Sequence, residues 1–168
     1  FALGGAITLA NQGTIVIPDS GVANRYPSFI PVSGLAGVVS KVTVTVSNLT
    51  HDFPEDIDAL LVGPAGQKVM LMSDAGASAN VTNVVLKFDD AGAPLPEAQI
   101  VSGTFHPTDY EPGETLPAPA PAGPYATALS AFNGFDPNGT WSIYVADDFA
   151  GDPGRITGGW SISITTFD

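Results

Sequence analysis

Residues 139–164, GTWSIYVADDFAGDPGRITGGWSISI, contain two runs in which apolar and polar side chains alternate. Each run begins with a tryptophan and has an apolar residue at every second position: Trp141, Ile143 and Val145 in the first, and Trp160, Ile162 and Ile164 in the second. A period of two is typical of strands that bury one face. The two runs are therefore predicted to form a β-hairpin at the edge of a β-sandwich.

The connection between the two runs, Asp147 to Gly154, is longer than the roughly two to five residues of an ordinary hairpin loop. Asp147, Asp148 and Asp152 place three carboxylates in it, which repel one another unless a cation, hydrogen-bond donors or solvent compensate. Carboxylate and loop carbonyl oxygens are the ligands that calcium prefers. The spacing does not match an EF-hand, so the loop is either part of another kind of calcium site or an acidic, solvated turn.

The 168 residues have the length of one domain, and 44% of them are hydrophobic, which is enough for a substantial core. The chain has 19 glycines and 15 prolines but only four Glu and three Lys, a composition that disfavours long helices. Strand-like segments separated by turn residues occur at Thr14–Ile17, Phe29–Val32, Val38–Val46, Ile57–Val62, Lys68–Met72, Val81–Phe88, Thr140–Val145 and Gly159–Thr165. We therefore predict an all-β fold, a jelly-roll-like β-sandwich of about eight strands over residues 14–168, with residues 1–13 as an N-terminal arm or first strand.

The segment from Ala91 to Ala128 lacks strand patterning because eight prolines interrupt it. Its run Pro117–Pro121, PAPAP, could be a polyproline ligand for a partner, but a long, rigid loop that covers the sandwich is the favoured interpretation. A short helical turn is expected at Ala126–Phe132.

The net charge of −12, with only five basic residues, argues against binding to nucleic acid or to anionic membranes, because both partners are recognised through Lys and Arg. No apolar run is long enough to insert into a membrane, and the absence of cysteine excludes disulfides and thiol chemistry. The chain starts without Met or a basic leader, so we expect a soluble, excised piece of a longer protein. Thirteen of the seventeen acidic residues are Asp, which suits oxygen-ligand cation sites and makes calcium the expected cofactor.

Further carboxylates follow or begin the predicted strands. Asp56 and Asp58 flank Ile57, so the pair could chelate a cation or form the wet side of an edge strand, and the solvated edge is favoured. Asp74 follows the strand Lys68–Met72, and Asp89 and Asp90 follow the strand that ends at Phe88. If these strand ends lie beside the Asp147–Asp152 loop, several segments could share one metal site.

No pattern in the chain predicts catalysis. The two histidines, His51 and His106, have no nucleophile motif nearby, and a structural role is favoured for both. Zinc-binding patterns, phosphate-binding glycine loops and paired cysteines are also missing from the sequence. We therefore expect that the protein is not an enzyme.

Several blocks of the sequence, in this order, resemble the P domain (P/homo B domain) that lies beside subtilisin-like proprotein convertases and occurs in many bacterial secreted proteins. The blocks are THDFPEDIDALLVGPAG at 50–66, LMSDAG at 71–76, FDDA at 88–91, DPNGTW at 136–141 and the segment from Asp147 to Trp160. This resemblance implies a jelly-roll-like sandwich, an extracellular setting, and calcium at loop carboxylates in some members. In convertases the domain folds with and stabilises the neighbouring protease.

From the residues and the resemblance together we predict a non-catalytic, calcium-stabilised module of a secreted or cell-surface protein. Its partner would be a neighbouring domain of the same protein or an identical subunit. The predicted calcium ligands are Asp74, Asp89, Asp90, Asp147 and Asp152, with Asp56, Asp58 and Asp148 as further candidates.

Two alternatives stay open. The apolar segment Phe1–Ala10 could add as a strand to the sheet of another subunit, which would make the protein a self-assembling subunit of an extracellular filament, or it could be the domain's own first strand. Adhesion to carbohydrate or protein would need an exposed aromatic platform, for which Tyr26, Tyr110 and Tyr125 are the candidates.

Overall fold

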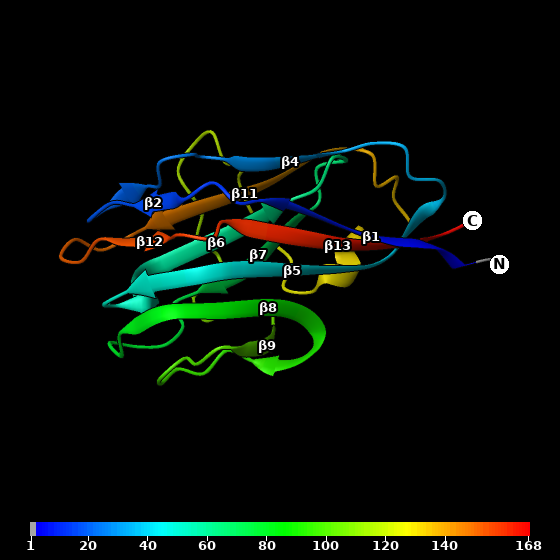
Figure 1. Cartoon of the computed structure of the whole chain (residues 1–168). Helices are drawn as coiled ribbons and strands as arrows, with labels where there is room; N and C mark the ends of the chain where they lie inside the picture. The colour runs from blue at the N-terminus through cyan, green and yellow to red at the C-terminus, as the bar shows by residue number, and fades with distance from the viewer. Residues whose placement is uncertain (1–2) are drawn as a thin grey trace.

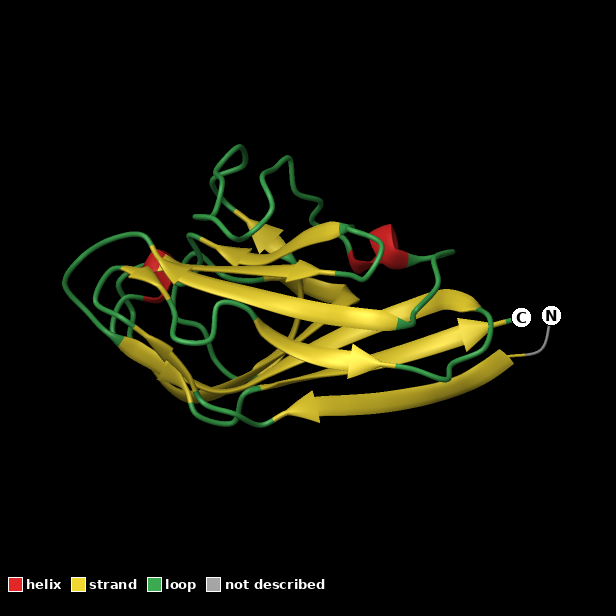
Figure 2. Cartoon of the chain, turned by 90° about the horizontal axis from the view of Figure 1, so that it is seen from above, coloured by secondary structure: helices red, strands yellow, loops and turns green. Residues whose placement is uncertain are grey.

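The computed structural model describes residues 3–168, which form two β-sheets that pack face to face (Figures 1 and 2). The seven-stranded sheet contains β1 (Leu3–Asn11), β2 (Ile15–Ile17), β5 (Val38–His51), β8 (Val81–Pro94), β9 (Gly103–His106), β12 (Gly154–Ile156) and β13 (Trp160–Phe167). The six-stranded sheet contains β3 (Gly21–Val22), β4 (Ser28–Val32), β6 (Ile57–Val62), β7 (Lys68–Ser73), β10 (Thr108–Asp109) and β11 (Gly139–Asp147). Two 3-10 helices, η1 (Pro54–Asp56) and η2 (Leu129–Phe132), complete the elements. The predicted all-β sandwich is confirmed, and no helix among residues 3–168 is long and apolar enough to cross a membrane.

Strand β5 organises the seven-stranded sheet. One of its sides pairs with β13 and then with β12, while its other side pairs with β8. Val42, Val44 and Val46 alternate along β5 and are at most 2% exposed, because this face of the strand forms part of the core. The valine alternation in the sequence thus determines which face of β5 points inward.

The six-stranded sheet places β6 at its centre, between β7 and β11. The other side of β11 pairs first with β4 and then with β3. Because β11 ends beside the start of β6, Asp147 pairs with Ile57 in the register of these two strands. The acidic loop after β11 therefore begins where β6 begins.

The predicted hairpin of the two tryptophan strands is wrong, because β11 and β13 belong to different sheets. Trp141 and Trp160 are each 1% exposed and enter the common core from opposite layers. Their indole N–H groups donate to the Pro137 carbonyl at 2.9 Å and to Ser28 Oγ at 3.0 Å. Two strands that face each other across a core show the same alternation as two paired strands, so the pattern did not distinguish the two arrangements.

The first segment of the chain forms a strand of its own domain. Residues Leu3–Asn11 pair antiparallel with β13, from Leu3 opposite Phe167 to Asn11 opposite Trp160. Phe1 and Ala2, the start of the predicted arm, lie outside the described residues. The filament alternative requires this segment to pair with another subunit. In this structure the segment pairs instead with β13 of its own chain.

The Pro-rich segment covers the outer face of the six-stranded sheet, and residues 110–128, between β10 and η2, are here called the Pro-rich cover. Leu60 of β6 and Met70 of β7 point away from the main core and are fully buried against Leu116 and Ala120 of the cover. Tyr26 on the sheet side donates its hydroxyl to the Pro117 carbonyl at 2.6 Å. The PAPAP run therefore serves as an internal cover of the sandwich.

The predicted helical turn is shorter in the structure, and the three candidate tyrosines do not form an exposed platform. The helix η2 is limited to Leu129–Phe132, while Ala126 exchanges backbone hydrogen bonds with β7. Tyr26 and Tyr125 are half-buried beneath or within the cover, and Tyr110 is 38% exposed. An adhesive platform would need these rings to be exposed, so this arrangement does not favour it.

The burial of Leu116 predicts that the cover contributes to stability. Replacing Leu116, which is 3% exposed, by Ala is expected to lower the free energy of unfolding by about 2–4 kcal/mol. Replacing the exposed neighbour Thr115 by Ala should change it by less than about 0.5 kcal/mol. Urea unfolding monitored by the fluorescence of the two buried tryptophans measures both, and equal stabilities of the two variants would show that the cover is not packed.

Candidate cation site

Three carboxylates from separate parts of the chain converge at the end of the sandwich where β6 begins. Oxygen atoms of Asp58, Asp74 and Glu114 all lie within 4.8 Å of one another. Asp58 is 4% exposed, and the other two residues are half-buried. Such a group of oxygen donors from three segments is a candidate cation site.

The fold explains why each of these side chains is present. Ile57 and Ala59 enter the main core, so Asp58 between them is turned to the outer face of the sheet. Asp74 follows β7 directly, with a φ of 54°, and its Oδ2 accepts a hydrogen bond of 2.8 Å from the Ser73 hydroxyl. Glu114 comes from the Pro-rich cover, two residues before the buried Leu116 that fixes this part of the cover on the sheet.

Burial and mutual repulsion shift the acid equilibria of the cluster. Burial, followed by the charge of Glu114, raises the pKa of Asp58 to about 8. Burial and the charge of Asp148 raise the pKa of Glu114 to about 7. In a carboxylate group without a cation, these shifts mean that protonation must relieve the repulsion.

Two more acids border the cluster. Asp148, in the loop after β11, lies beside Glu114, and its charge helps to raise the pKa of the Glu114 carboxyl. Asp109, at the end of β10, has its pKa raised by burial and by the charge of Asp74. A pocket of about 580 Å³, lined in part by Asp109 and Glu114, opens beside the group.

One oxygen of the cluster has no partner. Glu114 Oε2 is buried and makes no hydrogen bond, and it is the one buried side-chain polar atom of this kind among residues 3–168. Over the same residues, Lys41 forms an ion pair with Asp89, His51 contacts Asp147 and His106 contacts Asp90, so none of these pairs reaches the cluster. An orphaned acceptor among carboxylates fits a hard cation with oxygen ligands.

Asp147, one of the predicted calcium ligands, contacts His51 in this structure. Its Oδ2 lies 2.8 Å from Nε2 of His51, and both side chains are completely buried. His51 Nδ1 accepts the backbone N–H of Phe53, so the Nε2 atom carries the proton that is donated to Asp147. This pair joins the end of β5 to the end of β11 and engages both ring nitrogens of His51.

Asp56 and Asp152 lie next to the cluster without joining it. Asp56 is in η1, and burial followed by the charge of Asp147 raises its pKa to about 6. Asp152 is in the loop between β11 and β12 and lines a separate pocket with Asp56 and Phe149. Asp56 and Asp58 were expected to form a solvated strand edge. Asp58 is instead buried, and Asp56 is half-buried.

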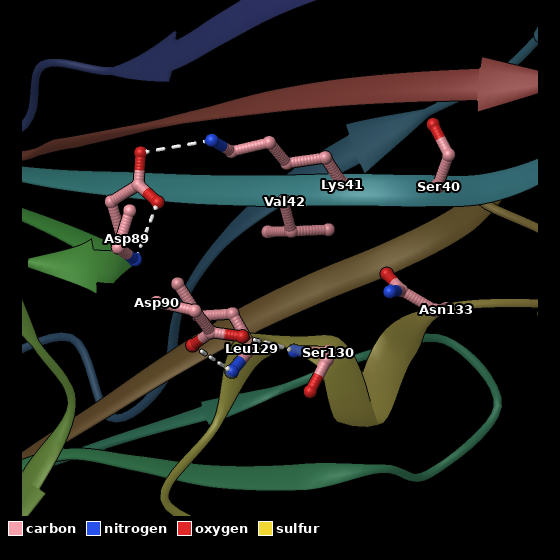
Figure 3. Close-up of a pocket in the computed structure, with 9 residues that line it drawn as sticks. Ser40, Lys41, Val42, Asp89, Asp90, Leu129, Ser130 and Asn133 are labelled. Carbon is pink, nitrogen blue, oxygen red and sulfur yellow. Dashed lines mark hydrogen bonds and ion pairs between the residues drawn. The ribbon is translucent and has the colours of Figure 1, made fainter.

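Asp89 and Asp90 are held by local partners (Figure 3). Asp89 forms an ion pair of 3.1 Å with Lys41, and its pKa is lowered by the Ala91 N–H and by that lysine. The two oxygens of Asp90 accept the backbone N–H groups of Leu129 and Ser130 at 2.7 and 2.8 Å, at the start of η2. Both carboxylates are therefore compensated without a metal ion.

The two acidic regions lie at opposite ends of the sandwich. Asp89 contacts Lys41 and Asp147 contacts His51, and these partners are ten residues apart on β5, roughly 33 Å at ~3.3 Å per residue. In Figure 1 the β11–β12 loop lies at one end and both termini at the other. The expected coincidence of strand ends fails because β8 begins at the acidic end, with Val81 opposite His51, and runs away from it before it reaches Asp89.

The structure thus brings together Asp58, Asp74 and Asp148 of the predicted residues and adds Glu114 and Asp109. The two added residues were missed because the whole segment from Ala91 to Ala128 was interpreted as a cover. The sequence does contain a signal, because Asp109, Glu111 and Glu114 cluster in a segment otherwise rich in Pro and Ala. Their position opposite β6 depends on how the cover folds back.

Comparison with known proteins supports the fold. No family model and no curated protein matches the sequence. Similar solved structures include the serine protease of Aeromonas sobria, at 13% identity and a TM-score of 0.50, and the complex of that serine protease with its chaperone, at 16% identity and a TM-score of 0.51. Each match covers 99% of this chain and 27% of the other chain, so this chain spans about a quarter of the length of those proteins. At these identities the likeness shows a shared β-sandwich, and the predicted P-domain family has no support from sequence comparison.

The raised pKa values predict how stability depends on pH when divalent cations are removed. In the unfolded chain Asp and Glu titrate near pH ~4, whereas in the folded chain the pKa of Asp58 is about 8 and that of Glu114 about 7. Between these values the folded protein binds more protons at these two groups, so their contribution to stability is complete below about pH 4 and is lost as the pH rises to 8. Thermal unfolding in chelator at pH 5, 6, 7 and 8 should therefore show a falling Tm.

Asp58→Asn is the matched variant for this measurement, because the amide has a similar shape and does not titrate. This variant should reduce the slope of Tm against pH. Part of the slope should remain, because the pKa of Asp56 is also raised. A Tm of the parent protein that stays constant or rises over this interval would contradict the assignment of a repulsive carboxylate cluster.

Proposed function

We propose that the chain is a non-catalytic accessory module of a secreted protein, stabilised by a calcium ion at Asp58, Asp74 and Glu114. The observation that carries this proposal is the convergence of three carboxylates from separate segments around a buried oxygen without a partner. A binding site made from β6, the end of β7 and the Pro-rich cover gives the ion a structural role.

Calcium fits these residues better than other common metals. The donors are carboxylate oxygens only, which suit hard cations, whereas zinc and copper sites use His or Cys. Calcium accepts six to eight oxygens in flexible geometry, and magnesium usually keeps several waters and holds few protein ligands. Asp148 and Asp109 border the three ligands and would add negative charge or further oxygens.

A bound cation would connect the Pro-rich cover to the six-stranded sheet. It would replace the repulsion between Asp58 and Glu114 by attraction to a common charge. Because Glu114 belongs to the cover, the ion would hold the cover to the sandwich. Preferential binding to the folded state then raises stability by mass action.

Two observations support the accessory role: the hydrogen bonds of His51 and the similarity to solved structures. His51 is the histidine nearest to the acidic end, and both of its nitrogens are engaged, which supports a structural use. The similar structures are a serine protease and its complex with a chaperone. With the resemblance to the P domain, this supports a module that lies beside a protease domain or another protein partner outside the cell.

Calcium is expected to stabilise the protein strongly at neutral pH. At a free concentration of about 100 times Kd, mass action gives about 2.7 kcal/mol, or a rise in Tm of about 5–10 °C for a domain of this size. Differential scanning calorimetry in calcium and in chelator measures this shift. An equal Tm in both conditions at pH 7.5 would exclude the proposed ion.

Three variants locate the ion. Asp58→Asn and Asp74→Asn should remove most of the calcium-dependent rise in Tm. Asp89→Asn, which alters a carboxylate predicted from the sequence but placed at the far end of β5, should leave the rise intact. If Asp89→Asn abolishes the effect while Asp58→Asn does not, the site lies elsewhere.

A further inference from the structure

A second acidic pocket, of about 250 Å³, lies between η1 and the β11–β12 loop. Its lining residues are Phe53, Glu55, Asp56, Phe149, Ala150 and Asp152. Two aromatic rings thus accompany three carboxylates, and no Lys, Arg or His of the described residues lines the pocket. This combination differs from the cation cluster, which has no aromatic residue among its three ligands.

Both rings of this pocket are available to a partner. Phe149 is 69% exposed, more than any other large apolar side chain of the described residues, and Phe53 is 37% exposed. Burying a phenylalanine favours folding by about 1.5–3 kcal/mol, so leaving two of them open around one pocket forgoes stability that a bound partner could recover.

The backbone of both rings is held in place by the buried pair of His51 and Asp147. The Phe53 N–H donates to His51 Nδ1 at 3.0 Å, and the Phe149 N–H donates to Asp147 Oδ1 at 3.1 Å. The two walls are joined again where the Asp148 N–H donates to the Asp56 carbonyl at 3.0 Å. The pocket is therefore anchored before any partner arrives, which lowers the entropic cost of binding.

We propose that this pocket binds an arginine side chain from a basic segment of a partner protein. A guanidinium group stacks on aromatic rings and donates to carboxylates in a fixed planar geometry, so it matches both components of the lining. The volume equals about eight water molecules at ~30 Å³ each and is below the ~300 Å³ at which sites for small-molecule ligands begin. It therefore suits one side chain.

The net charge indicates that the basic segment comes from a different protein. This chain has only five basic residues and a net charge of −12, so two copies repel each other. A basic partner is instead attracted over the whole surface. The proposal goes beyond the calcium-stabilised module and does not depend on the ion.

The test uses a fluorescein-labelled peptide, Gly-Arg-Arg-Arg-Gly, blocked at its carboxyl end, and a peptide with citrulline in place of every arginine. Fluorescence anisotropy in calcium-containing buffer is expected to show saturable binding of the arginine peptide that weakens with salt, and no binding of the citrulline peptide. Phe149→Ala and the double variant Glu55→Gln/Asp152→Asn should each weaken binding by about tenfold.

Matched controls separate this pocket from general acidity. Phe135→Ala removes another exposed ring, 47% exposed, and Glu97→Gln removes another exposed charge; both should bind as the parent does. Asp58→Asn should also bind as the parent does, whether or not the calcium proposal holds. The proposal is overturned if Phe149→Ala and the double variant bind unchanged, if the citrulline peptide binds equally, or if sedimentation shows that Phe149 instead mediates self-association.

Discussion

The outer face of the six-stranded sheet has to be covered, because β6 and β7 turn Leu60 and Met70 away from the main core. The Pro-rich cover meets this need through Leu116 and Ala120. Proline suits such a segment, since it restricts the backbone and donates no N–H to a sheet ladder. The rest of the acidic end depends on this cover, because the cover brings Glu114 over the start of β6.

Covering that face also buries charge. Asp58 continues the outward-facing row that begins with Leu60, and the cover removes it from water together with part of Glu114. Burial of carboxylates without a counter-charge is costly, and the cost is visible in the raised pKa values of both groups. A calcium ion would relieve this cost and would connect the cover to the sheet. The neighbouring pair of His51 and Asp147 shows the other solution, in which hydrogen bonds from His51 and from the Phe149 N–H make a buried carboxylate tolerable.

The sequence allowed the fold class and most strands to be predicted, because alternation such as that of Trp141 and Trp160 reports which residues face a core. It did not allow the sheet of each strand to be predicted, since paired strands and facing strands alternate alike. The acidic loop after β11 lies next to the cluster through Asp148, whereas Asp89 lies far from it, because β8 begins at the acidic end and runs away from it. Glu114 was missed because its neighbours are determined by the packing of the cover, which has no periodic signal.

The most direct test of the central claim is a crystal structure of the protein grown in calcium, with anomalous diffraction data collected at long wavelength. The account predicts an anomalous peak within about 2.3–2.6 Å of oxygen atoms from Asp58, Asp74 and Glu114. A crystal in calcium with no peak among these three side chains, or with its peak beside Asp89 and Asp90, would contradict it.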